Sequence, residues 1–121
     1  MALPNDRKYT QDHLWVKPEG ENYLLGITET ALELMGEINQ VQFSVKTGPQ
    51  KKEQIFCSIE SEKTVIDLVT PAKGDIVEIN KKLEDDASSL ANNIYETWLI
   101  KMVMAPADYQ SLLSAGEYKQ G

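Results

Sequence analysis

Short runs in which apolar and polar residues alternate, each ended by a cluster of turn residues, constrain the fold of this chain more than any other feature. Val41, Phe43 and Val45 alternate with polar residues, which is the pattern of a half-buried strand. Clusters that contain Pro and Gly, at residues 18–22 and 71–74, separate such runs. Many short strands joined by close turns predict an all-β sandwich or barrel with small peripheral helices.

The same pattern places the other strands, and capping residues place the first helix. The expected strands are residues 13–16, 23–27, 41–45, 55–59, 65–70, 76–79 and 98–102. A short helix should follow the second of these strands and end at Gly36. Either Thr28 or Thr30 can cap this helix, and Thr30 with Glu33 matches a capping box.

The last third of the chain predicts a long connection and a terminal helix. Residues 80–97 are mostly polar, with a helical turn expected around residues 87–92. Pro106 should open a C-terminal helix whose apolar residues share one side, with Gly116 past its end. These apolar residues are Tyr109, Leu112 and Leu113.

Length and charge limit the organisation of the chain and its partners. The 121 residues suit a single domain over residues 1–121, in which residues 1–8 form a loose polar lead-in. The chain has 12 Lys and Arg against 19 Asp and Glu, a formal net charge of −7. This balance argues against nucleic acid as a partner, because phosphate binding needs clustered cations. It suits basic faces on other proteins.

Few residues offer metal-binding or nucleophilic chemistry. A zinc site of the Cys/His type needs four ligands, and the chain has one His, His13, and one Cys, Cys57. No phosphate-binding glycine loop, nucleophile elbow or Cys-x-x-Cys pair occurs. The acidic run at residues 84–86 lacks the spaced ligands of a calcium loop and is expected to be a solvated turn. We therefore expect no metal site and no catalysis by the chain alone.

The cysteine count also bears on the compartment. A single cysteine cannot form an internal disulfide, so a reducing compartment, the cytoplasm, is expected. Residues 1–7 lack the apolar run of a secretory signal. No stretch approaches the ~20 apolar residues of a membrane span, and we expect no membrane partner.

The stretch from residue 57 to residue 74 is the most informative part of the sequence. Two strand-like arms flank a polar tip at residues 60–64, so Lys63 should project from a hairpin with nothing to bury it. On the pattern alone, Lys63 is interpreted as a solvated turn lysine.

This stretch resembles the H protein of the glycine cleavage system, a family of lipoyl carriers. The turn of that family has the form E-S-x-K, which Glu60-Ser61-Glu62-Lys63 matches. The residues that keep the family's spacing from the lysine are Asp67, Pro71, Gly74 and Asn80. The matching residues elsewhere are Tyr9, Thr10, His13, Trp15, Val16, Gly26, Ile27, Thr28, Leu34, Met35, Gly36, Leu90, Asn92, Tyr95, Trp98 and Tyr118. The similarity therefore extends from about residue 9 to residue 118.

The resemblance implies both a fold and a cofactor. The implied fold is mainly β, the flattened β-barrel or barrel-sandwich hybrid of lipoyl carriers, with short peripheral helices and a C-terminal helix. The implied cofactor is lipoate, held on Lys63 by an amide bond and acting as a swinging arm. Acylation would remove one positive charge and move the formal net charge from −7 to −8. The resemblance implies a carrier without catalytic residues of its own, and so not an enzyme.

The resemblance also implies partners. In the family the arm shuttles an aminomethyl group and reducing equivalents among the enzymes of the glycine cleavage system. These are glycine decarboxylase (P protein), an aminomethyltransferase (T protein) and dihydrolipoyl dehydrogenase (L protein). A lipoate ligase or a lipoyl transferase would attach the arm.

Roles for several residues of the hairpin follow from the resemblance. Glu60 and Gly74 would help the lipoylating enzyme to recognise the domain; otherwise they are a solvated acid at a strand end and a plain turn glycine. Ser61 and Asp67 would support the hairpin, Asp67 through hydrogen bonds to the backbone. Cys57 is interpreted as a core thiol on one face with Ile55 and Ile59, and His13 as structural.

Departures from the family pattern leave alternatives open. The segment at residues 95–98 is one residue shorter than in the family and lacks glycine, and residues 42–44 replace a Leu-Pro pair. Glu62 and Thr64 flank the lysine, where the family often has small or apolar neighbours. One alternative is a divergent H-like protein that serves other enzymes as a lipoyl donor or redox scaffold, and another is an unmodified interaction domain. A biotinyl carrier usually presents M-K-M, which Glu62-Lys63-Thr64 does not match.

Overall fold

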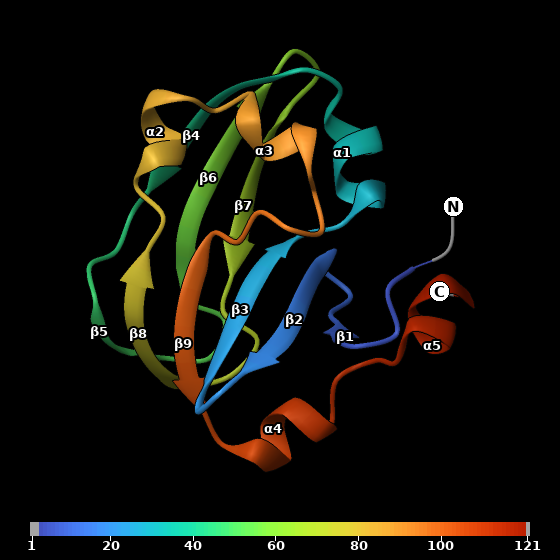
Figure 1. Cartoon of the computed structure of the whole chain (residues 1–121). Helices are drawn as coiled ribbons and strands as arrows, with labels where there is room; N and C mark the ends of the chain where they lie inside the picture. The colour runs from blue at the N-terminus through green and yellow to red at the C-terminus, as the bar shows by residue number, and fades with distance from the viewer. Residues whose placement is uncertain (1–2, 121) are drawn as a thin grey trace.

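The structure, a computed structural model, describes residues 3–120, without the side chain of Gln120, as two antiparallel β-sheets with short helices around them (Figure 1). The strands are β1 (Lys8–Tyr9), β2 (Leu14–Glu19), β3 (Asn22–Ile27), β4 (Ile38–Phe43), β5 (Gly48–Gln50), β6 (Ile55–Ser61), β7 (Val65–Val69), β8 (Gly74–Ile79) and β9 (Ile100–Met104). The helices are α1 (Glu29–Met35), α2 (Lys82–Asp85), α3 (Ser89–Asn92), α4 (Pro106–Gln110) and α5 (Ala115–Gln120).

The two sheets enclose one main hydrophobic core. The larger sheet has the strand order β1-β2-β3-β9-β8-β5, and the smaller has the order β4-β6-β7. Leu25 of β3, Val41 of β4 and Ile59 of β6 all belong to this core, so both sheets contribute their inner faces to it. The alternating pattern predicted this mainly β architecture with peripheral helices, and the structure confirms it.

The first helix begins two residues earlier than the capping box suggested. Thr28, not Thr30, is the N-cap of α1, and its hydroxyl oxygen accepts a hydrogen bond from the Ala31 N–H at 3.3 Å. Thr28 is fully buried, whereas Thr30 is exposed in the first turn. Gly36 ends the helix with φ +75°, as expected from its place in the sequence.

A bulge in β6 changes which side chains face the core. The pairing of β6 with β7 shifts in register between Ile55 and Cys57, so Phe56 and Cys57 are both fully buried. Ile55 is 41% exposed, which makes the prediction that it shares the inner face with Cys57 and Ile59 wrong for Ile55. An inserted residue breaks the period of two, and the alternation in the sequence does not reveal it.

The later part of the chain differs from the expected elements in its strand boundary and its helices. The last strand begins at Ile100 and not at Trp98, and the N–H of Leu99 just before it bonds the Leu25 carbonyl of β3. The connection at residues 80–97 holds two short helices, α2 and α3, where one helical turn was expected. The acidic run at residues 84–86 is exposed, as expected, but it lies at the end of α2.

The single C-terminal helix expected from Pro106 is wrong, because the chain forms two helices separated by residues 111–114. Leu113 exchanges backbone hydrogen bonds of 2.8 and 2.9 Å with Tyr9, which draws the chain out of the helix. Ser114 and Glu117 then cap α5 reciprocally, with N–H to oxygen distances of 2.9 and 3.2 Å. Gly116 therefore lies inside α5 rather than past a helix end.

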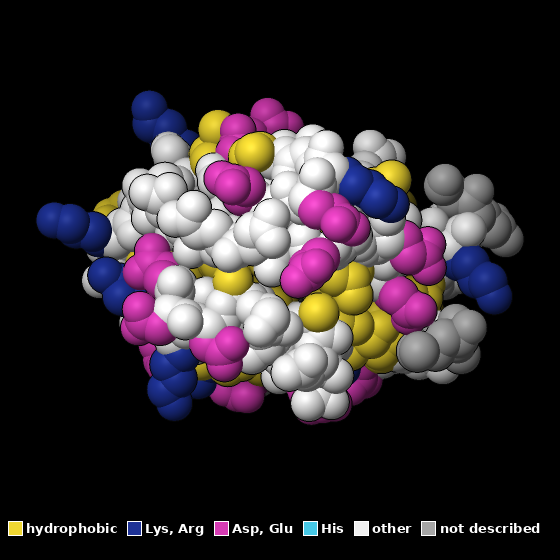
Figure 2. All heavy atoms as spheres, turned by 90° about the horizontal axis from the view of Figure 1, so that it is seen from above, with side chains coloured by type: hydrophobic (Ala, Val, Ile, Leu, Met, Phe, Trp, Pro, Cys, Tyr) yellow, Lys and Arg dark blue, Asp and Glu magenta, His cyan; other side chains and the backbone are white. Residues whose placement is uncertain are grey.

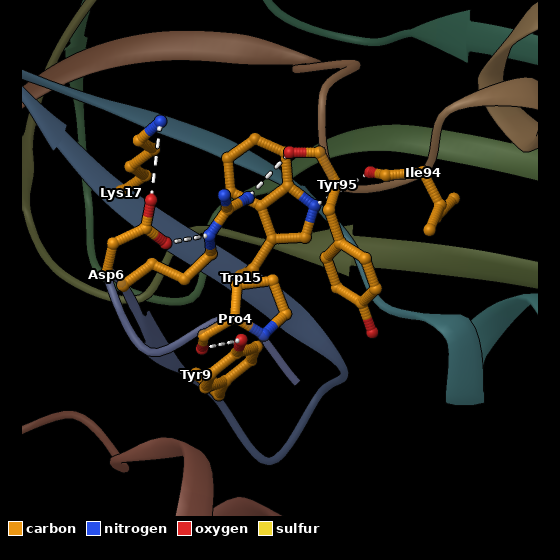
Figure 3. A network of polar contacts seen from close by, with 8 residues as sticks. Pro4, Asp6, Tyr9, Trp15, Lys17, Ile94 and Tyr95 are labelled. Carbon is orange, nitrogen blue, oxygen red and sulfur yellow. Dashed lines mark hydrogen bonds and ion pairs between the residues drawn. The ribbon is translucent and has the colours of Figure 1, made fainter. Parts of the chain in front are cut away.

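The described part of the expected lead-in at residues 1–8 is attached to the body of the fold, and residues 1–2 lie outside the described residues. Arg7 is 6% exposed, and its guanidinium lies 4.7 Å from the centre of the Trp15 ring. Figure 3 labels Trp15 together with the nearby Asp6 and Tyr95. It donates to the Tyr95 carbonyl at 2.7 Å and to the Asp6 carboxylate at 2.9 Å. The hydrogen bond from Arg7 lowers the pKa of the Asp6 carboxyl.

Candidate functional site

The turn between β6 and β7 presents Lys63 to solvent at one end of the molecule. The loop that joins β6 to β7 is the uppermost point of the fold in Figure 1. Lys63 is exposed, and no hydrogen bond or ion pair that the structure records among residues 3–120 involves its ammonium group. A lysine in this position can meet the active site of another protein without any rearrangement of the core.

Ser61 closes the turn below Lys63. The Ser61 N–H donates to the Thr64 carbonyl at 2.9 Å. The Ser61 hydroxyl donates to the same carbonyl at 2.8 Å and accepts from the Thr64 N–H at 3.2 Å. Through these bonds the buried Ser61 side chain ties both ends of the turn together.

Asp67 supports the hairpin through a side chain rather than through the backbone. Asp67 of β7 lies opposite Ser58 of β6, and the Ser58 hydroxyl donates to the Asp67 carboxylate at 2.6 Å. This corrects the expectation of backbone hydrogen bonds from Asp67. A cross-strand bond between a hydroxyl and a carboxylate fixes the register of the two strands that carry the turn.

Glu62 joins the turn to the end of α1, a link that the sequence analysis missed. The Glu62 N–H donates to the Glu37 carbonyl at 3.0 Å, and the Glu37 N–H points to the Glu62 carboxylate at 3.5 Å. Directly beside this link, Ile38 of β4 pairs with Ser61 of β6. The sequence singled out Glu62 only as a departure from the family. The contact could have been predicted only by pairing the strand that follows Gly36 with β6, because that pairing places Glu37 beside Glu62.

The structure brings Glu60 close to Lys63 but does not bring Gly74 there. Glu60 is exposed and pairs with Val65, the first residue of β7, immediately below the turn. Gly74 opens β8, beyond the far end of β7, and a strand of that length spans roughly 17 Å. A Cβ atom at Gly74 would collide with the Val103 carbonyl oxygen of β9. Gly74 therefore has a packing role that is separate from the turn.

Cys57 is a core residue, as interpreted from the sequence. Its side chain is fully buried in β6, and burial raises the pKa of the thiol to about 12. At neutral pH the group is protonated and enclosed, so it is a poor nucleophile.

His13 takes part in a structural network that holds α5 against the body of the fold. Its Nδ1 atom lies 2.6 Å from the Tyr118 hydroxyl, which lies 2.7 Å from the Thr28 hydroxyl. This series of hydrogen bonds joins the turn before β2, the C-terminal helix α5 and the N-cap of α1. His13 also has a φ of +67°, which its place in a tight turn requires.

Acidic and apolar side chains surround the Lys63 turn. Leu34 at the end of α1 and Val65 after the turn are 53% and 60% exposed. The exposed acidic residues on the turn, on the strand before it and on or just after α1 are Glu62, Glu60, Glu33 and Glu37. Figure 2 looks down on this end of the molecule; acidic side chains are spread over it, apolar atoms show between them, and most Lys and Arg side chains lie at its rim.

The described part of the chain has neither a cluster of metal ligands nor a membrane-spanning helix. Within residues 3–120, no three His, Cys, Asp or Glu side chains gather as ligands for a metal ion. The described helices are all too short and too polar to cross a membrane.

A sequence model of one family, described as "Glycine cleavage H-protein", matches residues 7–121 of the chain. The chain belongs to the glycine cleavage H-protein family. The H protein of Listeria innocua is 38% identical over 123 residues, which cover 100% of this chain and 98% of that protein. The H protein of Staphylococcus carnosus is 38% identical over 122 residues, which cover 99% of this chain and 97% of that protein.

A solved H protein has the same fold. The crystal structure of a glycine cleavage system H protein from Mycobacterium marinum superposes with a TM-score of 0.84 at 34% sequence identity, over 98% of this chain and 97% of that one. The family is the lipoyl carrier of the glycine cleavage system. The resemblance inferred from the hairpin residues and the fold class that it implied are therefore confirmed.

Proposed function

We propose that Lys63 carries lipoate in an amide bond and that the chain is a non-catalytic carrier of the glycine cleavage system. The observation that supports this most strongly is the exposed Lys63, which pairs with no other residue of the described part of the chain, at a hydrogen-bonded turn in a member of the H-protein family. The residues around it fit the group, because the turn is closed by Ser61 and leaves the Lys63 amine clear of the core.

Attachment needs little from the carrier except access. A lysine amine has a pKa near 10.4 in water and must lose a proton before it can attack an activated acyl carbon. The Lys63 nitrogen would form the new bond to that carbon, and the bond to the activating group would break, its electron pair leaving with that group. The ligase or transferase would supply the base that takes the proton, since no carboxylate among residues 3–120 forms a recorded hydrogen bond or ion pair with Lys63.

The bound lipoyl group would supply a dithiolane that opens on reduction and carries a one-carbon unit and reducing equivalents. The chain itself would hold the arm at a fixed point and dock it at successive enzymes. Tethering raises the effective concentration of the dithiolane at each active site that the domain meets. Its single thiol, on Cys57, is buried, so all of the accessible sulfur chemistry belongs to the cofactor.

The proposed partners are the P, T and L proteins and a lipoate ligase or lipoyl transferase. All of them must reach Lys63, so they must approach the end of the molecule shown in Figure 2. The acidic side chains at this end favour partners whose docking surface carries basic residues. The exposed Leu34 and Val65 side chains offer apolar contact to such a partner. The proposed compartment is the cytoplasm, because a single unpaired thiol suits a reducing environment.

We also propose that Glu60 contributes to recognition by the lipoylating enzyme. Its exposed carboxylate lies at the strand end next to the turn, where it can meet a cation of the enzyme. A recognition role for Gly74 would be indirect, through the course of β8, because Gly74 lies away from the turn.

Reconstitution tests the function. The lipoylated carrier, combined with a P protein, should support exchange of label between bicarbonate and the carboxyl group of glycine, and the unlipoylated carrier should not. A lipoylated chain that supports no exchange with the P protein of its own organism would instead favour the H-like donor or scaffold. A chain that a lipoate ligase does not modify at all would favour the unmodified interaction domain.

Charge reversal at the Lys63 end should slow docking. We expect Glu33→Lys to raise the carrier concentration that half-saturates glycine exchange several-fold at low salt, because it removes steering charge from an exposed position on α1. Glu21→Lys is the matched control: it makes the same change in net charge in the exposed turn between β2 and β3, at the opposite end of the fold (Figure 1). Equal effects of the two variants would show that net charge alone matters.

A further inference from the structure

An exposed lysine on a hairpin needs something to fix its direction, and Glu62, the residue before it, has the contacts to do so. Its N–H donates to the Glu37 carbonyl at 3.0 Å, and its carboxylate accepts a long hydrogen bond of 3.5 Å from the Glu37 N–H. Both of these backbone groups belong to Glu37, which lies in the segment that follows α1. The turn is thus attached on one side to a different element of the fold.

The Glu62 carboxylate lies against Gly36, in space that a side chain at position 36 would share. A Cβ atom at Gly36 would lie 2.7 Å from the Glu62 Oε1 atom, closer than non-bonded atoms allow. Gly36 also has a φ of +75°, which side chains rarely adopt. The helix end and the carboxylate therefore fit against each other, and a side chain at position 36 would displace one of them.

Successive residues make this junction continuous. Gly36 lies against the Glu62 carboxylate, Glu37 bonds to Glu62, and Ile38 pairs with Ser61 at the start of the β4–β6 ladder. A register shift follows between Ile38 and Gln40, so the regular ladder does not support the turn by itself. The Glu62 contacts add a restraint on the residue before the lysine, beside the Ser61–Thr64 hydrogen bonds that close the turn.

We infer that Glu62 is a positioning residue, which couples the Lys63 turn to the C-terminal end of α1 and sets the direction in which the lysine is offered to the lipoylating enzyme. This inference rests on the proposed lipoylation of Lys63. A turn held in one orientation loses less freedom when an enzyme encloses it, so the restraint acts on the rate of modification rather than on the global stability. The negative charge of Glu62 is not what matters here; its acceptor oxygen and its fit against Gly36 are.

The test compares Glu62→Ala with Glu62→Gln as substrates of a lipoate ligase. Glu62→Ala removes the acceptor oxygen, so we expect kcat/KM for lipoylation to fall roughly two- to fivefold, the range set by one modest hydrogen bond. Glu62→Gln keeps an acceptor oxygen in the same place and should restore most of the rate. Both variants should melt within a few degrees of the parent, because Glu62 is exposed.

Amide hydrogen exchange supplies a readout that does not depend on lipoylation. The Glu37 amide should exchange faster in Glu62→Ala and at the parental rate in Glu62→Gln. Gly36→Ala should weaken the same protection by displacing the carboxylate. In the double variant Gly36→Ala/Glu62→Ala, the Glu37 exchange rate should rise by less than the product of the two single increases, since both substitutions remove the same contact.

The outcomes separate the two proposals. Equal loss of rate in Glu62→Ala and Glu62→Gln would assign Glu62 to charge recognition and overturn the positioning role. Unchanged rates and unchanged Glu37 exchange in Glu62→Ala would overturn it as well. If the parent chain is not lipoylated while Glu37 protection depends on the Glu62 acceptor, the carrier function fails and the coupling between the turn and α1 remains. That coupling would then have no part in lipoylation.

Discussion

Lys63→Arg should abolish the mass gain that a lipoate ligase produces in this chain, and with it all exchange activity. The guanidinium of arginine stays protonated and is a poor nucleophile towards an acyl carbon, so the charge is kept while the chemistry is lost. Lys63 is exposed and takes part in no recorded hydrogen bond or ion pair among the described residues. The free energy of unfolding should therefore change by no more than about 0.5 kcal/mol. Intact-mass measurement before and after incubation, together with a melting curve, checks both parts.

Lys73→Arg is the matched control for this experiment. Lys73 is also exposed, but it lies in the turn between β7 and β8, at the other end of the hairpin. We expect this variant to gain one lipoyl group as the parent does. A Lys63→Arg chain that still gains mass would place the arm on another lysine. A large fall in its melting temperature would mean that Lys63 is structural.

Gly74→Ala should give the largest loss of stability among the substitutions considered. A Cβ atom at this position would collide with the backbone carbonyl oxygen of Val103, because β8 and β9 approach closely where Gly74 pairs with Met104. A backbone carbonyl cannot rotate away as a flexible side chain can, so the strands must separate. Forcing an extra carbon into such a place costs about 1–3 kcal/mol or more. Thermal or urea unfolding followed by circular dichroism measures the loss.

Gly116→Ala is the control, because it adds the same atom where there is room. Nothing lies within 4 Å of a Cβ atom at Gly116, and the residue is inside α5. Alanine is the better helix former, so this variant should be as stable as the parent or slightly more stable. The lipoylation rate of the folded fraction of Gly74→Ala then tests whether Gly74 also matters to the enzyme. A variant of parental stability that is poorly lipoylated would favour direct recognition.

The sequence predicted the elements whose signals are local. The strands β4, β6, β7 and β8 show alternation over several residues, and Gly36 ends its helix by a conformation that few other residues adopt. The strand β5, which is only three residues long, was not expected. The Lys63 turn could be placed because its two arms and its flanking residues all lie within one short stretch. Its resemblance to the H-protein family extended that placement to a function.

The features that the sequence did not reveal depend on partners distant along the chain. The break between α4 and α5 is set by the backbone bonds between Leu113 and Tyr9, which no helical pattern can show. Arg7 was expected to belong to a loose polar lead-in, but its guanidinium packs over the Trp15 and Tyr95 rings and donates to the Tyr95 carbonyl. Glu62 likewise acquires its role from Glu37, 25 residues earlier. In each case tertiary contacts outweigh the local preference.

The enclosed thiol of Cys57 has a practical consequence for measuring the carrier. Alkylating reagents attack thiolates that they can reach, and the folded polypeptide offers them none at neutral pH among its described residues. A count of alkylated sulfurs on the folded, lipoylated protein would thus report the oxidation state of the appendage alone. The redox state of the lipoyl group could therefore be measured by alkylation without first replacing Cys57.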